Sequence, residues 1–235
     1  MKIGLLICDH VRPVHLDIAG DYDEMFSRLF DHRDDVELVT YNVVNGEMPD
    51  RATECAAWLT TGSRYSVNDD EQWIRDLEEF VREVAEDRVP LVGVCFGHQL
   101  IAKALGGSVV RSERGWGVGI KEVEIADGLD WAKNAGSCRV ASVHQDQVDR
   151  LPPDAEILGW NDHCPVSMMS VGSTILGLQG HPEMGPDYIE AVVQMRKGTL
   201  IPEDVADEGL ASLVNEPDTT MLADWIVGFL ETAMS

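Results

Sequence analysis

The segment Gly93–Gly107, GVCFGHQLIAKALGG, joins an apolar run to a helical pattern through a turn that is centred on a cysteine. The preceding run, Leu91–Val94, is short and continuously apolar, which is typical of a strand buried on both faces. Glycine lies two residues before and two residues after Cys95, and small neighbours leave room for a sharp strand-to-helix turn. The segment therefore predicts a nucleophile elbow with a thiol in place of a hydroxyl.

Two physical effects favour a reactive thiolate at Cys95. Unpaired N–H groups gather at the start of a helix, and a nearby histidine can share the proton. The N–H of Phe96 points the same way and can bind an oxyanion, an interaction worth about 2.7–4 kcal/mol in acyl transfer. The alternative is a buried structural cysteine in a glycine-rich turn, and the short motif alone does not separate the two.

Strand-like and helix-like segments alternate around this elbow. We expect strands at Lys2–Cys8, Val36–Tyr41 and Ala57–Thr60, and helices over Tyr22–Phe30, Ile74–Val84 and from the elbow to Leu105. This alternation predicts βαβ units and a parallel sheet.

The pattern changes after Ser108, where β-prone pieces follow one another without helices. They are Gly119–Ile125, Arg139–Val143, Ile157–Trp160 and Thr174–Leu178, and they predict late strands plus a small added β-hairpin layer. A helix is expected from Pro186 to about Lys197, followed by the acidic stretch Pro202–Glu208 and a last helix over Thr219–Ala233. We expect one domain over residues 1–200, with residues 201–235 as a C-terminal helical extension packed on it.

Composition narrows the classes of partner. The 235 residues carry 42 acidic and 18 basic side chains, a net charge of −24, which argues against binding a nucleic-acid backbone. The five cysteines include no CxxC pair, and Met1 leads directly into the first strand without a signal peptide. No apolar run approaches the roughly 20 residues that span a bilayer. We therefore expect a cytoplasmic protein with reduced thiols and no membrane contact.

A cysteine nucleophile needs a base, and His181 is the best candidate among the seven histidines. It lies in Gly177–Glu183, GLQGHPE, directly after an expected strand. Pro182 favours an extended backbone at His181, and side chains two residues apart then point to one side. Glu183 can thus reach back to the imidazole, hold the ring and stabilise its charged form.

The other histidines are weaker candidates. His98 is expected to face outward or to pack on a loop, whereas His144 ends a strand and can line a pocket. Loop or surface positions are expected for His10, His15, His32 and His163. Because no cluster has metal-ligand spacing, we expect neither a metal nor a cofactor.

The two motifs together resemble the class I (triad) glutamine amidotransferases, which combine G-x-C-x-G-x-Q with a later G-x-Q-x-H-P-E. Here these are Gly93–Gln99 and Gly177–Glu183, and the likeness covers most of the chain to about Glu183. It implies an α/β, flavodoxin-like, mostly parallel sheet flanked by helices. It also implies a triad of Cys95, His181 and Glu183, and a γ-glutamyl thioester on the cysteine.

The resemblance also assigns the second oxyanion donor and the substrate contacts. In Leu59–Ser63, LTTGS, Gly62 matches the second glycine of the common L-S-G-G-P turn, while both its neighbours depart from it. Gln99, Gln145 and Asp146 match positions that line the glutamine site; for Gln99 the alternative is a surface position on the helix. The segment Gly62–Asp70, GSRYSVNDD, is similar to a stand-alone branch near the plant γ-glutamyl peptidases.

The expected reaction is hydrolysis of the γ-amide of glutamine or of a γ-glutamyl compound, releasing glutamate and ammonia. The ammonia serves a separate synthetase subunit, or the chain works alone. One alternative is a γ-glutamyl peptidase that releases an amine or a dipeptide. Another is a non-catalytic regulatory or binding subunit with the same fold. A redox-sensing thiol protein would leave the His-Pro-Glu segment unexplained.

Overall fold

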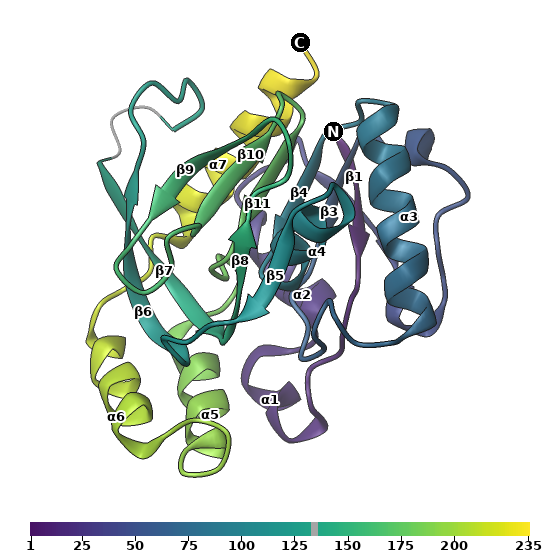
Figure 1. Cartoon of the computed structure of the whole chain (residues 1–235). Helices are drawn as coiled ribbons and strands as arrows, with labels where there is room; N and C mark the ends of the chain where they lie inside the picture. The colour runs from purple at the N-terminus through teal and green to yellow at the C-terminus, as the bar shows by residue number, and fades with distance from the viewer. Residues whose placement is uncertain (133–135) are drawn as a thin grey trace.

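The fold is built on a nine-stranded sheet in the order β2-β1-β3-β4-β11-β10-β9-β6-β7 (Figure 1). The computed structural model describes residues 1–132 and 136–235. The half of the sheet from β2 to β11 is parallel. Its strands are β1 (Lys2–Leu6), β2 (Glu37–Tyr41), β3 (Ala57–Thr60), β4 (Leu91–Val94) and β11 (Ile175–Leu178).

The late strands extend this same sheet in antiparallel pairs. They are β6 (Gly117–Ile125), β7 (Ser137–His144), β9 (Ala155–Trp160) and β10 (Met168–Val171). The added β layer is instead a two-stranded sheet of β5 (Ser108–Arg111) and β8 (Asp146–Arg150). The sequence prediction missed β8 because its DQVDR pattern contains one apolar residue among polar ones.

Helices cover both faces of the sheet. They are α1 (Leu16–Ala19), α2 (Tyr22–Leu29), α3 (Gln72–Glu86), α4 (Phe96–Ala104), α5 (Pro186–Arg196), α6 (Glu203–Ala211) and α7 (Thr219–Ala233). Short 3-10 segments lie at η1 (Pro13–His15), η2 (Val43–Asn45), η3 (Ala52–Glu54) and η4 (Ser212–Val214). The acidic stretch after Pro202 forms α6, which the sequence analysis did not assign as a helix. In the described parts of the chain, no helix has the length and apolar content to cross a membrane.

Alternating side chains of the strands fill two cores. Leu5 packs with α2 and α7 on one face, and Leu6 packs with α3 and α4 on the other; both leucines are fully buried. Helix α7 also contacts β4, and α6 contacts β6, so the C-terminal helices lie against the main sheet. A mixed sheet with a parallel half that carries the elbow, and with helices on both faces, confirms the predicted α/β class.

Candidate active site

Cys95 lies at the sharp turn between β4 and α4, where it caps the N-terminus of the helix. Its backbone has φ 51° and ψ −96°, a region that costs a residue with a side chain about 1–3 kcal/mol. The Cys95 N–H donates to the Leu178 carbonyl at 2.7 Å, which ties the turn to β11. The strand-turn-helix geometry predicted from the sequence is therefore present.

Both flanking glycines are required by close packing. A Cβ at Gly93 would lie 2.5 Å from the carbonyl carbon of Gly97. A Cβ at Gly97 would lie 1.5 Å from Oγ1 of Thr60 on β3. Any larger residue at either position would force the turn apart, and this explains the spacing of the motif.

His181 follows β11 and pairs with Glu183. The Nδ1 atom of His181 and Oε1 of Glu183 are 2.8 Å apart, and the side chains are 3% and 0% exposed. The His181 N–H donates to the carbonyl of Ala141 at 2.8 Å and fixes the backbone. Burial lowers the pKa of His181, but the charges and hydrogen bonds of Cys95 and Glu183 outweigh it and raise the pKa to about 10. The two acidic partners of His181 therefore favour its protonated form.

Gly62 lies against the side chains of His181 and Cys95. A Cβ at Gly62 would be 2.6 Å from Cε1 of His181 and 3.6 Å from Cβ of Cys95. The hydroxyl of Thr61 donates to the Gly62 carbonyl at 3.0 Å and accepts from the Cys8 N–H at 2.9 Å. Thr61, which departs from the common glycine turn, therefore holds this turn in place through its hydroxyl group. Phe96 is the first residue of α4, and such a residue has no intrahelical acceptor for its N–H.

The residues expected to bind substrate gather beside Cys95. The Gln99 amide donates to the Asp146 carbonyl at 2.8 Å and to Oε1 of Gln179 at 3.1 Å. The Ser66 hydroxyl donates to Oδ2 of Asp146 at 2.7 Å. Gln99 is 4% exposed, so the surface alternative for this residue is wrong. Gln145 and Asp146 both line the cavity over Cys95.

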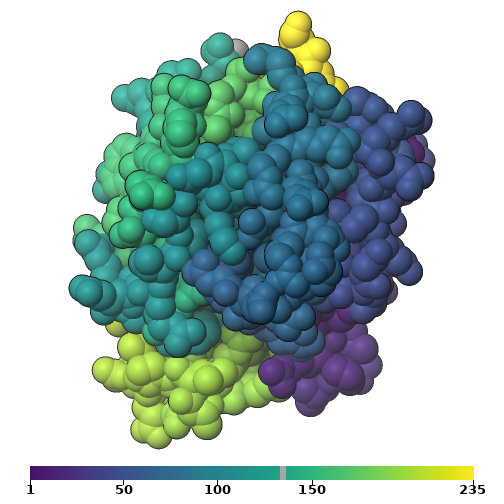
Figure 2. All heavy atoms as spheres, turned by 45° about the vertical axis from the view of Figure 1, so that its right-hand side comes forward, coloured from purple at the N-terminus to yellow at the C-terminus, as the bar shows by residue number. Residues whose placement is uncertain are grey.

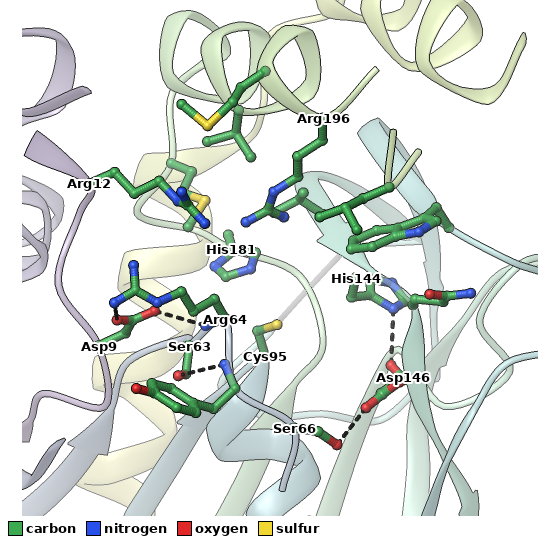
Figure 3. Close-up of a pocket in the computed structure, with 18 of the residues that line it drawn as sticks. Asp9, Arg12, Ser63, Arg64, Ser66, Cys95, His144, Asp146, His181 and Arg196 are labelled. Carbon is green, nitrogen blue, oxygen red and sulfur yellow. Dashed lines mark hydrogen bonds and ion pairs between the residues drawn. The ribbon is translucent and has the colours of Figure 1, made fainter. Parts of the chain in front are cut away.

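A cavity of about 520 Å³ opens over Cys95 and His181. Figure 2 shows the N-terminal segment (purple) and the region around α5 and α6 (yellow-green) together at one end of the molecule, and α1 contacts α5 there. Figure 3 shows side chains from both segments pointing into the cavity. Lining residues that the sequence analysis did not single out include Asp9, Arg12, Ser63, Arg64, Trp116 and Arg196. For Asp9 a signal existed, because ligands bind beyond the carboxyl ends of parallel strands and Asp9 follows β1.

Asp9 connects two of the loops that form this cavity. Its carboxylate accepts from the N–H of His10 at 2.8 Å and from the N–H of Arg64 at 2.9 Å. The guanidinium of Arg64 also pairs with it at 3.2 Å. The loop after β1 is thereby held against the turn that contains Gly62.

For two other histidines, the exposed one of the two expected positions is wrong. His98 is fully buried rather than outward-facing, because Gly177 makes room for its ring: a Cβ there would be 2.4 Å from Nδ1 of His98. Burial lowers the pKa of His98 to about 4. His15 is buried and lines the cavity rather than the surface. His144 lines the cavity as expected, and burial lowers its pKa to about 3.

The fold and the site together define an α/β protein with a cysteine elbow beside a buried histidine–carboxylate pair. The family model "Glutamine amidotransferase class-I" matches residues 15–192, so the chain belongs to this family. Among solved structures, a glutamine amidotransferase from Thermotoga maritima superposes with a TM-score of 0.74 at 21% identity. That comparison covers 99% of this chain and 97% of the other, and it supports the fold.

Two curated relatives differ in how much of the chain they match. Gamma-glutamyl peptidase 5 of Arabidopsis thaliana is 30% identical over 214 residues, which is 85% of this chain and 83% of the relative. One subunit of the glutamine-hydrolysing GMP synthase of Pyrococcus furiosus is 40% identical over 109 residues. The Pyrococcus match covers 46% of this chain and 57% of the relative.

Proposed function

We propose that this chain hydrolyses γ-glutamyl amide bonds, with Cys95 as the nucleophile, His181 as the acid and base, and Glu183 as the residue that orients the histidine. One observation carries the proposal: the strained Cys95 elbow lines one cavity together with His181, whose Nδ1 lies 2.8 Å from Oε1 of the buried Glu183. A purely structural cysteine would need neither this strained turn nor a buried His181–Glu183 pair beside it.

The reaction follows from the charges at the site. The Cys95 thiolate attacks the γ-carbonyl carbon, and a C–S bond forms as the carbonyl oxygen becomes an oxyanion. The C–N bond then breaks, and the His181 imidazolium gives its proton to the leaving nitrogen. A water molecule, deprotonated by His181, attacks the resulting thioester. The C–S bond breaks, glutamate leaves and the thiolate is restored.

The neighbouring groups suit the other needs of this reaction. The N–H groups of Gly62 and Phe96 bind the oxyanion, an interaction that supplies about 2.7–4 kcal/mol per donor in related chemistry. The Asp146 carboxylate, with Gln99 and Gln145, binds the polar end of the glutamyl group. Glu183 stabilises the imidazolium and fixes its orientation.

The leaving group separates two versions of the function. With glutamine as substrate, ammonia leaves and serves a separate synthetase subunit, as the name of the Pyrococcus relative implies for that protein. With a γ-glutamyl peptide, an amino acid or peptide leaves, as the name of the Arabidopsis relative implies. The Arabidopsis match spans most of both chains, which favours the peptide. All five cysteines are unpaired, and this supports action in a reducing compartment such as the cytoplasm.

The test is a substrate panel with the purified chain alone. Glutamine and several γ-glutamyl amides are supplied, and both glutamate and ammonia are quantified. We expect glutamate release by the wild type and none by the Cys95→Ala variant, with equal thermal unfolding of the two. Retained hydrolysis by Cys95→Ala would remove the mechanism. Absence of any hydrolysis by the wild type would favour a regulatory or binding subunit.

A further inference from the structure

Arg12 and Arg196 converge above His181 from two separate parts of the chain. Arg12 directly precedes η1, and Arg196 is the last residue of α5. Both line the cavity over Cys95. In Figure 3 their guanidinium groups point toward each other on the side of His181 that faces away from Cys95. The two cations therefore frame one end of the cavity.

This pair is unusual in a chain with 42 acidic and 18 basic side chains. The third arginine at this end, Arg64, is neutralised by Asp9 at 3.2 Å. Within the described residues, no carboxylate comes within the 4.0 Å of an ion pair with Arg12 or Arg196. The chain thus has a large excess of acidic side chains, yet none of those that the structure describes pairs with the two arginines beside Cys95 and His181.

The electrostatic surroundings of Arg12 and Arg196 favour an anion between them. Arg196 is half-buried and lies over the Trp116 ring, with Cζ 5.8 Å from the ring centroid. Burial lowers the pKa of Arg196, and the positive charge of Arg12 lowers it further. Burial and these same two cations lower the pKa of His15. An anion between the arginines would relieve this repulsion and accept charge-assisted hydrogen bonds.

The position of the pair indicates which part of a substrate it meets. Asp146 lies at the opposite end of the cavity in Figure 3, where a carboxylate attracts the ammonium of a glutamyl group. His181 gives its proton to the leaving nitrogen, so the leaving group extends from Cys95 past His181. A leaving group that continued in this direction would approach the two arginines.

We propose that Arg12 and Arg196 bind the carboxylate of an amino acid or peptide that leaves from a γ-glutamyl substrate. Preferred substrates are therefore γ-glutamyl amino acids or peptides, since the ammonia that leaves glutamine has no carboxylate for the arginines to bind. The inference rests on the proposed γ-glutamyl hydrolysis and names its substrate class. Met195, which precedes Arg196 in α5, and Leu200 also line the cavity with exposed side chains and give apolar surface for the leaving residue.

The experiment compares two substrates that differ only in the charge at this end, γ-glutamylalanine and γ-glutamylalaninamide. Values of kcat/KM are measured for the wild type, Arg12→Gln, Arg196→Gln and the double variant. The control is Arg114→Gln, an exposed arginine outside the cavity lining. We expect the wild type to prefer γ-glutamylalanine. Each cavity variant should lose about 10- to 100-fold on that substrate, as for a lost hydrogen bond between charged groups, and little on the amide. Arg196→Lys should recover part of the loss.

The outcomes are separable. Equal losses on γ-glutamylalanine, its amide and glutamine would mean that the arginines bind the glutamyl group itself, and this overturns the inference while the hydrolysis stands. An unchanged preference in the double variant also overturns it. Wild type that hydrolyses none of the three substrates contradicts the proposed function and the inference together. Thermal unfolding of each variant identifies any loss that comes from misfolding.

Discussion

Replacing Glu183 by glutamine removes one negative charge and keeps the size of the side chain. The carboxylate and the His181 ring are both almost completely buried, with Oε1 2.8 Å from Nδ1. If the charge centres are about 4 Å apart, an effective dielectric constant of about 20 gives about 4 kcal/mol for their attraction. Each 1.36 kcal/mol is about tenfold in rate, so Glu183→Gln should lower kcat/KM about a thousandfold.

The assay is glutamate release from a γ-glutamyl amide under steady-state conditions. Glu190→Gln, an exposed glutamate on α5, is the matched control and should keep wild-type activity. Thermal unfolding checks that both variants are folded. If folded Glu183→Gln retains more than about a tenth of the wild-type kcat/KM, the carboxylate does not stabilise the imidazolium during the reaction, and the electrostatic reasoning is refuted.

Three further predictions concern the geometry of the site, the packing of the core and the titration of His181. Gly62→Ala places a Cβ 2.6 Å from Cε1 of the buried His181, so we expect a loss of about 100-fold or more in kcat/KM and a lower unfolding temperature; normal activity would contradict the close approach. Leu77→Ala, at a fully buried position on α3, should lower the free energy of unfolding in urea by about 2–5 kcal/mol, and a smaller loss would mean a looser core. In NMR titrations His181 should hold its proton until about pH 10. In the Cys95→Ala variant His181 should lose its proton at a lower pH, because the charge of Cys95 is gone. Because this folded-state pKa is raised, its stabilising contribution is complete below about pH 6.5 and declines as the pH rises through about 10. Equal pKa values of His181 in the wild type and in Cys95→Ala would contradict an ion pair between Cys95 and His181.

The elements that the sequence predicted best are those with strong local patterns. The last helix was expected over Thr219–Ala233 and has these bounds, because its apolar face repeats at helical spacing. The turn at Cys95 could be recognised because two glycines have no room for side chains. The pairing of His181 with Glu183 followed from their spacing in an extended segment.

What the sequence did not reveal depends on contacts between distant segments. His98 was expected to face outward or to pack on a loop, because nothing in α4 indicates that Gly177, far along the chain, leaves space for its ring. Arg12 and Arg196 line one cavity because α1, which follows Arg12 in the chain, contacts α5. A local sequence pattern does not predict a contact between segments this far apart in the chain. The weakly apolar β8 is ordered by its pairing with β5, which the spacing of its own residues does not predict.

The central claim is that Cys95 carries the glutamyl group as a thioester during turnover. The most direct measurement is acid quenching of the enzyme during steady-state hydrolysis, followed by mass spectrometry of the intact chain and of its peptides. We predict a mass increase of one γ-glutamyl group on the peptide that contains Cys95, and none in Cys95→Ala. Glutamate release by the wild type with the label on another residue, or by the Cys95→Ala variant, would contradict the account.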